Sequence, residues 1–175
     1  MKTLVVGWNY IQVHAESLSY KIKASFGHQK KWRGVIAIAR GGLAPAVIIA
    51  HCLGISRVVS LQVASRGDDG DILPQTTVYN DSHDARPLAT TVQDHGEDWL
   101  IVDDLIDSGT TAQRVMKLFP KAVYAVLFAK PEGKGLASIY EEDLPQDIWI
   151  VFPWEHRKSS RTGSVNATKV RAEDS

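Results

Sequence analysis

Short, continuously apolar runs alternate along the chain with segments of helical periodicity. Each run predicts a strand covered on both faces, because a strand with one solvated face would alternate apolar and polar residues. Strands are expected at residues 35–39, 58–64, 99–102 and 123–128. Helices are expected at residues 9–24, 43–53 and 110–119. Helices between apolar strands predict the α/β class, with a mostly parallel twisted sheet flanked by helices and joined by right-handed crossovers.

The ends of these helices carry sequence signals of their own. Asn9 followed by Gln12 predicts a capping box at the start of the first helix. Gly54 is expected to end the second helix and Pro120 the third. The buried face of the first helix is expected to carry Ile11, Leu18 and Ile22.

Two stretches do not fit this alternation. Residues 65–98 are rich in glycine and acidic residues, and a segment this long inside a compact domain is typical of a functional loop. We expect a mobile hood loop there with a hairpin, its short strands at 75–79 and 88–92. Residues 156–175 hold almost no apolar side chains and predict a disordered polar tail. The rest of the chain, residues 1–155, is expected to form one domain.

Composition narrows the classes of function. The 175 residues include 20 Lys and Arg against 20 Asp and Glu, and this neutral balance disfavours a nucleic-acid partner. The single cysteine, Cys52, excludes an internal disulfide and lies in an apolar run, where we expect a small core residue. The N-terminal residues do not resemble a signal peptide, and no apolar run approaches membrane-spanning length, so we expect a cytoplasmic protein.

The strand predicted at residues 99–102 leads into the most distinctive chemistry of the chain. The carboxylates of Asp103 and Asp104 follow it, and Asp107 comes shortly before the helix predicted to start at residue 110. The turn between them offers backbone N–H groups, hydroxyls and the positive end of a helix dipole, which suit a phosphate dianion. The members of this turn are Ser108, Gly109, Thr110 and Thr111. The carboxylates could hold ribose hydroxyls, a metal or a proton. An acidic loop beside an ordinary Ser/Thr helix cap is the alternative.

A second candidate element follows the strand predicted at residues 35–39. Arg40 can give two parallel hydrogen bonds to phosphate oxygens, while Gly41 and Gly42 allow the backbone to approach a ligand closely. The alternative is an ordinary strand-to-helix turn with a surface arginine. Ligands of open parallel sheets bind beyond the carboxyl ends of the strands, near a reversal of strand order. The position of both elements at strand ends therefore favours a binding site.

A third candidate element follows the strand predicted at residues 123–128. The ammonium of Lys130 can donate to a carbonyl or an anionic oxygen, and Pro131 prevents the strand from continuing. Further along, Trp149 and Ile150 offer an aromatic face and backbone groups suited to a planar base. Taken alone, Trp149 is more typical of a core or hood residue.

Together these elements resemble the type I phosphoribosyltransferases, and specifically the bacterial xanthine-guanine phosphoribosyltransferases. The resemblance covers most of residues 4–154 and rests on segments at residues 32–43, 101–111, 128–131 and 144–154. The acidic pair with its hydroxyl-rich turn is typical of the superfamily. The spacing from the lysine to the tryptophan is typical of the branch that acts on 6-oxopurines. The resemblance implies the type I phosphoribosyltransferase fold, with a small hood and a flexible loop over about residues 65–98.

The resemblance also implies a reaction in purine salvage. The N9 atom of a 6-oxopurine, such as xanthine, guanine or hypoxanthine, would receive the 5-phosphoribosyl group of phosphoribosyl pyrophosphate. The products would be the nucleoside 5′-monophosphate and pyrophosphate. Mg²⁺ would be the cofactor, with Asp104 as its ligand from the protein. A homodimer or homotetramer is implied as well, and peripheral membrane association would be consistent with the family.

The residues that bind the phosphoribosyl donor take their roles from the same resemblance. Asp103 and Asp104 would hold the ribose hydroxyls and stabilise positive charge on the ring. The turn that starts at Asp107 would bind the 5′-phosphate. Arg40 and Gly41 would contact pyrophosphate, through a turn that is often a non-proline cis peptide in this family.

The residues that bind the base are implied in the same way. Asp107 would face purine N7 as a general acid or base. Lys130 would donate to purine O6, which selects oxopurines against adenine because the adenine amino group offers no acceptor there. Trp149 would stack on the base, and the backbone carbonyls of Trp149 and Ile150 would contact its 2-substituent.

Two other classes of function compete with this interpretation. A regulator of the same fold would bind a nucleotide without turnover, but the acidic pair and Arg40-Gly41-Gly42 favour catalysis. A response-regulator receiver also combines an acidic pair with a Lys-Pro sequence. Its acidic pair comes near the N-terminus, whereas here too little chain lies between Asp103 and Lys130 for that fold. We therefore expect a transferase.

Overall fold

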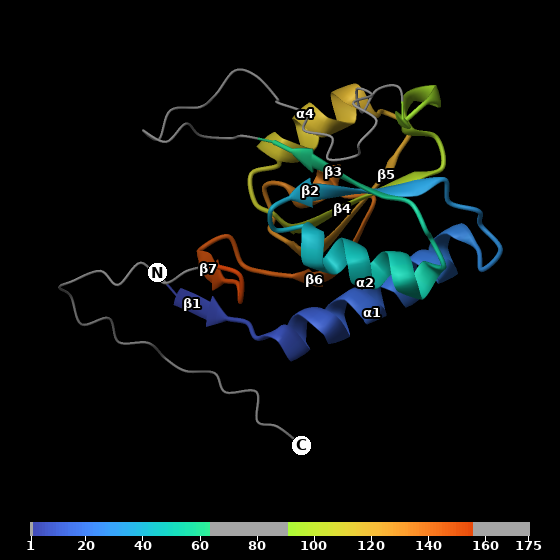
Figure 1. The fold of residues 1–175 in the computed structure, drawn as a ribbon. Coiled ribbons are helices and arrows are strands. Elements are labelled where there is room, and N and C mark those ends of the chain that lie inside the picture. The colour runs from blue at the N-terminus through green and yellow to red at the C-terminus, as the bar shows by residue number, and fades with distance from the viewer. Residues whose placement is uncertain (1, 64–90, 156–175) are drawn as a thin grey trace.

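The computed structural model describes residues 2–63 and 91–155 (Figure 1). The predicted tail at 156–175 lies outside the described residues, as does most of the predicted hood loop. The elements in chain order are β1 (Lys2–Val5), α1 (Trp8–Phe26), β2 (Gly34–Ala39), α2 (Leu43–Leu53), β3 (Val58–Gln62), the 3₁₀ turn η1 (Asp94–Gly96), β4 (Trp99–Ile106), α4 (Thr110–Leu118), β5 (Val123–Ala129), the 3₁₀ turn η2 (Lys134–Leu136), β6 (Ile139–Asp143) and β7 (Ile148–Val151).

The larger sheet has five strands in the order β3-β2-β4-β5-β6, and all four of its pairings are parallel. The predicted parallel α/β sheet is therefore confirmed. The chain moves outward from β2 to β3, returns to place β4 on the other side of β2, and then continues outward through β5 and β6. Strand order thus reverses between β2 and β4, and a crevice for ligands is expected beyond the carboxyl ends of these two strands.

Helices cover both faces of this sheet, with α1 and α2 on one side and α4 on the other (Figure 1). Strand β2 shows how the sequence produces this arrangement. Val35 and Ala37 pack into the core with α1 and α2, while Ile36 and Ile38 pack into the core with α4. All four are buried, because a central strand between two helical layers has no solvated face. The predicted buried face of α1 is confirmed at Ile11, Leu18 and Ile22.

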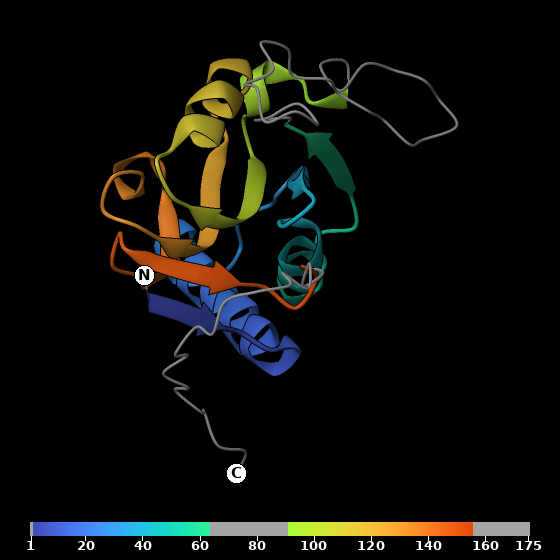
Figure 2. The same cartoon turned by 90° about the vertical axis from the view of Figure 1, so that its left-hand side faces the viewer.

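A second, two-stranded sheet pairs β1 with β7 in parallel, and it joins the two ends of the described chain. Figure 2 shows the side of the molecule that carries the carboxyl ends of the strands of the larger sheet. On this side β1 and β7 lie next to each other. Sequence patterning predicted neither strand of this pair, nor β6. In the predicted hood loop, Thr91 and Val92 are not in a strand, so the strand expected at 88–92 is wrong over its described part.

Four local predictions need correction. Helix α1 begins at Trp8 with Gly7 as its N-cap, so the predicted capping box is wrong, and Gln12 bonds instead to the Glu16 carboxylate at 3.0 Å. Strand β4 runs on to Ile106 rather than ending at residue 102. Strand β3 ends at Gln62, before the end predicted at residue 64. Cys52 is half-buried rather than in the core. No helix in the described parts of the chain is long and apolar enough to cross a membrane.

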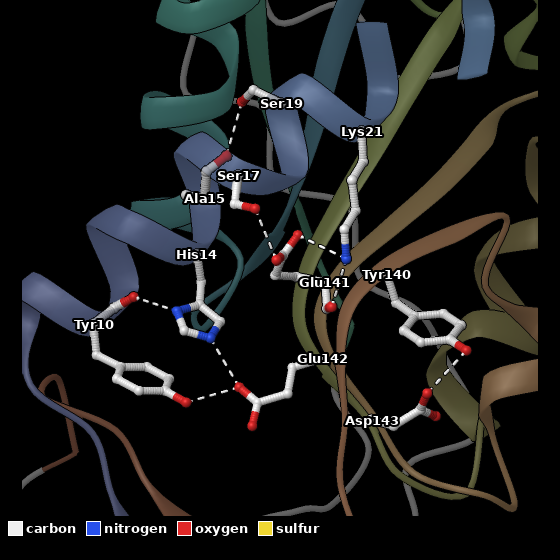
Figure 3. Close-up of polar contacts among 10 residues, drawn as sticks. All are labelled: Tyr10, His14, Ala15, Ser17, Ser19, Lys21, Tyr140, Glu141, Glu142 and Asp143. Carbon is white, nitrogen blue, oxygen red and sulfur yellow. Dashed lines mark hydrogen bonds and ion pairs between the residues drawn. The ribbon is translucent and has the colours of Figure 1, made fainter. Parts of the chain in front are cut away.

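Polar contacts hold α1 against β6 (Figure 3). The hydroxyl of Tyr10 donates to Glu142 Oε2 at 2.7 Å, and His14 Nε2 lies 2.8 Å from the same oxygen. The ring of Tyr10 also stacks on His14 at a centroid distance of 3.9 Å. Burial and the Glu142 carboxylate together raise the pKa of Tyr10 to about 12. Two turns further along, Lys21 donates to the backbone carbonyl of Glu141 at 2.7 Å. These contacts connect the helix to the strand that leads into the candidate site.

Candidate active site

The three candidate elements meet at the carboxyl ends of neighbouring strands, as the sequence predicted. Arg40 follows β2, Asp107 follows β4, and Lys130 follows β5. The N–H of Lys130 donates to the carbonyl of Ile106 at 2.9 Å. This bond joins the segment that follows β5 to the end of β4, directly before Asp107. Because the strands are parallel and paired in register, their ends form one continuous edge.

The acidic pair lies inside β4 rather than after it. Asp103 is only 7% exposed, and its carboxylate accepts hydrogen bonds from the Tyr124 hydroxyl at 2.9 Å and from the Asp104 N–H at 3.0 Å. Burial raises the pKa of Asp103 to about 6. The pKa of Asp104 is raised well above its ordinary range by burial and by the charge of Asp103. The site therefore holds two carboxylates whose ionised forms the fold disfavours.

The Arg40-Gly41-Gly42 turn packs directly on this pair. A Cβ on Gly41 would overlap the carboxylate of Asp104, and a Cβ on Gly42 would overlap the carbonyl of Val102. The peptide between Ala39 and Arg40 is cis, as the resemblance implied. Arg40 itself is exposed at this edge. A side chain at residue 41 would displace the Asp104 carboxylate, whereas one at residue 42 would meet the backbone of β4 and β2.

The hydroxyl-rich turn after Asp107 leads into α4, which begins at Thr110. Gly109 precedes the helix with a left-handed φ of 80°, a conformation that favours glycine. The hydroxyls of Ser108 and Thr110 lie 3.0 Å apart, and both residues are exposed, while Thr111 is half-buried. The turn and the first N–H groups of α4 offer hydrogen-bond donors of the kind that bind a phosphate.

Lys130 and Asp107 are brought together by the fold. The ammonium of Lys130 lies 3.2 Å from Asp107 Oδ2, and its side chain is 5% exposed, whereas that of Asp107 is 52% exposed. The other carboxylate oxygen of Asp107 accepts a 2.6 Å hydrogen bond from the amide of Gln146. A buried cation thus reaches a carboxylate that remains open to solvent.

Trp149 and Ile150 belong to the two-stranded sheet, where they pair with Thr3 and Leu4 of β1. Trp149 is 52% exposed, while Ile150 is buried. Trp149 is therefore not a core residue, which its residue type taken alone had suggested. Its aromatic surface is open to a planar ligand.

A family model described as the phosphoribosyl transferase domain matches residues 8–159. The chain belongs to this family. The resemblance identified from the sequence is thereby confirmed, and so is the type I phosphoribosyltransferase fold.

Solved structures share this fold. The chain is 26% identical to a purine phosphoribosyltransferase from Pyrococcus horikoshii, with a TM-score of 0.68 over 93% of this chain and 100% of that one. It is 21% identical to a xanthine-guanine-hypoxanthine phosphoribosyltransferase from Helicobacter pylori, with a TM-score of 0.61 over 87% and 93% of the two chains. A protein from Neisseria gonorrhoeae with bound ppGpp is 22% identical, with a TM-score of 0.62 over 90% and 91%.

The acidic pair of this phosphoribosyltransferase fits Mg²⁺. Within residues 2–63 and 91–155, no group of three or more His, Cys, Asp or Glu side chains could hold a metal by itself. Mg²⁺ is commonly bound through one or two carboxylates plus the phosphates of a substrate, so a full protein cage is not needed. Burial and then repulsion by Asp103 raise the pKa of Asp104, and a bound cation would offset the repulsion. Asp104 suits the metal better than Asp103 because it is only partly buried.

Two residues that contact the candidate carboxylates of this phosphoribosyltransferase were not predicted from the sequence. Tyr124 donates to the buried carboxylate of Asp103, and Gln146 donates to Asp107. In the sequence, Tyr124 lies within the apolar run predicted as a buried strand, and nothing there indicates a contact with Asp103. Gln146 lies in a segment that carried the resemblance, but only the tertiary structure reveals its contact with Asp107.

Proposed function

We propose that this phosphoribosyltransferase acts in purine salvage, on a 6-oxopurine base such as xanthine, guanine or hypoxanthine. It would transfer the 5-phosphoribosyl group of phosphoribosyl pyrophosphate to N9 of the base and release pyrophosphate. The observation that carries the proposal is the Lys130–Asp107 pair beside the hydroxyl-rich turn. Lys130 would be the donor to O6 of the base, and Asp107 the carboxylate that faces N7. Both lie next to the turn proposed to bind the 5′-phosphate.

The comparisons support a purine substrate. The Pyrococcus horikoshii relative is described as a purine phosphoribosyltransferase and aligns over its whole length. The Helicobacter pylori enzyme is described as acting on xanthine, guanine and hypoxanthine. The base-binding residues proposed here, Lys130 and Trp149, belong to the part of the chain that the family model covers.

In the proposed reaction the acidic pair serves the ribose. Asp103 and Asp104 accept hydrogen bonds from the ribose hydroxyls and stabilise positive charge as C1′ gains oxocarbenium character. Arg40 and the N–H groups after it bind the pyrophosphate. Asp104 would hold Mg²⁺, which when bound would supply positive charge to offset that of the leaving pyrophosphate. The turn from Asp107 to Thr111 binds the 5′-phosphate and so fixes C1′ in front of the base.

The base side of the proposed site selects the substrate. Lys130 donates to purine O6, whereas adenine presents an amino group at that position, which places a second donor against the buried ammonium. Asp107 accepts the N7 proton as N9 bonds to C1′ and the bond from C1′ to pyrophosphate breaks, and it returns that proton in the reverse reaction. Trp149 stacks on the ring, and the backbone carbonyls of Trp149 and Ile150 contact the 2-substituent.

The experiment that tests the proposal measures nucleotide formation from phosphoribosyl pyrophosphate and Mg²⁺ with xanthine, guanine, hypoxanthine and adenine in separate assays. Turnover with at least one oxopurine and none with adenine is expected. Lys130→Met should lower kcat/KM for the oxopurine about 100-fold, since a charged hydrogen bond is lost. Lys117→Met, at an exposed position of α4, is the matched control.

A nucleotide-binding regulator of the same fold is the competing class. It would bind phosphoribosyl pyrophosphate or a purine nucleotide in calorimetry but show no turnover with any of the four bases. That result would refute the proposed transferase. If Lys130→Met left the oxopurine kinetics unchanged, the result would instead show that Lys130 does not contact the base.

A further inference from the structure

Gln146 connects three segments of the candidate site. It lies in the short connection between β6 and β7, three residues before Trp149. Its side-chain amide donates to Asp107 Oδ1 at 2.6 Å, on the turn proposed for the 5′-phosphate. Its amide oxygen accepts a 3.2 Å hydrogen bond from the N–H of Glu132, two residues after Lys130. The residue therefore contacts both the carboxylate proposed for N7 and the segment that carries the lysine proposed for O6.

The second of these hydrogen bonds determines which way the amide points. A glutamine amide has one accepting and one donating end, and a backbone N–H can bond only to the accepting end. Because Glu132 donates to the oxygen of Gln146, the nitrogen must face Asp107. The amide is thus oriented before any ligand binds.

The segments that Gln146 bridges are also packed tightly on each other. A Cβ on Gly133 would overlap the carbonyl of Asp107, and the N–H of Gly133 donates to the carbonyl of Lys130 at 3.1 Å. The backbones of the two loops are therefore fixed relative to each other. The side chain of Asp107 is less constrained, since it is 52% exposed and, among the described residues, side-chain donors alone hold it.

Lys130 is one of these donors, but the proposed function gives its ammonium a second partner. When Lys130 turns toward O6 of the base, its 3.2 Å contact with Asp107 weakens or is shared. Gln146 bonds to the opposite carboxylate oxygen and has no such competing role. We propose that Gln146 is a positioning residue that keeps the Asp107 carboxylate oriented toward N7 while Lys130 binds the base. This inference rests on the proposed function of the site.

The kinetic test uses Gln146→Met, which keeps the length of the side chain and removes the donor. We expect kcat to fall about tenfold, the loss of one hydrogen bond to a charged group, with KM for phosphoribosyl pyrophosphate unchanged. Gln146→Glu places a carboxylate against Asp107 and should lower kcat further. Gln12→Met, on the exposed side of α1, is the matched control and should behave as the parent. An unchanged kcat in Gln146→Met would overturn the inference.

A double-mutant cycle separates positioning from general damage. If Gln146 acts through Asp107, then adding Gln146→Met to Asp107→Asn should cause no further loss of kcat. Losses that multiply in the double variant, or a lowered melting temperature of Gln146→Met, would mean that the residue acts through the fold instead.

A spectroscopic measurement tests the contact without relying on turnover. The side-chain amide signals of Gln146, assigned by their disappearance in Gln146→Met, should shift in Asp107→Ala in nuclear magnetic resonance spectra. Unshifted signals would overturn the inference even in an active enzyme. Shifted signals in a parent protein that shows no turnover would refute the proposed function and leave the Gln146–Asp107 contact standing.

Discussion

Replacing Asp103 with asparagine should stabilise the fold at neutral pH while it impairs the site. Asp103 is 7% exposed and lies beside a second carboxylate, Asp104. At pH 7 the fold must therefore keep an ionised group where the neutral form is favoured. Asparagine carries no charge, and its side-chain oxygen can still accept the hydrogen bond that Tyr124 donates at 2.9 Å.

The magnitude follows from the pKa of Asp103, which burial raises from 3.8 to about 6. That rise corresponds to about 3 kcal/mol of unfolding free energy lost at pH 7. Asparagine has only one accepting end, so with its oxygen on Tyr124 it loses the hydrogen bond from the Asp104 N–H, which subtracts about 1 kcal/mol. The expected net gain of Asp103→Asn is about 2 kcal/mol.

The sign of the pH dependence provides the check. Because the pKa of Asp103 is higher in the folded than in the unfolded state, the folded parent binds more protons between about pH 4 and pH 6. Its stability therefore falls as pH rises through this window. The advantage of the variant should be complete above about pH 6 and should vanish below about pH 4.

Urea unfolding of parent and variant at about pH 7 and about pH 4 measures this difference. The exposed Asp147→Asn substitution is the matched control and should change the unfolding free energy by less than about 0.5 kcal/mol at either pH. The reasoning fails if Asp103→Asn destabilises the protein at pH 7, or if its gain is the same at both pH values. A stabilised variant with poor turnover would indicate a site that trades stability for function.

Three further predictions follow from individual contacts. Tyr124→Phe removes the hydroxyl donor of the buried carboxylate and should lower the unfolding free energy at pH 7 by about 1–3 kcal/mol in urea titrations. Gly41→Ala should raise KM for phosphoribosyl pyrophosphate at least about tenfold, because a Cβ there overlaps the Asp104 carboxylate. Gly135→Ala, with no heavy atom within 4 Å of the added Cβ, should leave KM unchanged, and equal effects of the two would contradict this account. The pKa of Tyr10 is raised to about 12, so the unfolded state loses that proton first and stability falls between about pH 10 and 12. The fall should be shallower in Tyr10→Phe, and an identical slope would show that Tyr10 titrates normally.

The sequence by itself determined the central layer of the fold and the edge that carries the site. The apolar runs at 35–39 and 123–128 located β2 and β5 within one residue, because a strand buried on both faces cannot alternate. Helix α2 ends at Leu53 as predicted, since Gly54 takes the left-handed conformation that ends it. Parallel strands end at a common edge, so Arg40, Asp107 and Lys130 could be placed there from their positions in the chain.

Patterning failed where a strand has no continuous buried face. Strands β1 and β7 are four residues each, and Val5 and Trp149 are more than half exposed, so neither resembles a central strand. The first helix begins at Trp8 because Gly7 already serves as its N-cap, and Asn9 then lies inside it. Short edge elements and helix ends depend on what the rest of the chain packs against them.

Only the tertiary structure decided the partners of the acidic side chains. Tyr124 is 21 residues from Asp103 and Gln146 is 39 residues from Asp107, so these contacts depend on the register of β4 with β5 and on the path from β6 to β7. The sequence around a carboxylate does not show which distant residue will pack against it. The sequence therefore located the carboxylates, whereas the packing of the strands determined what orients and buries them.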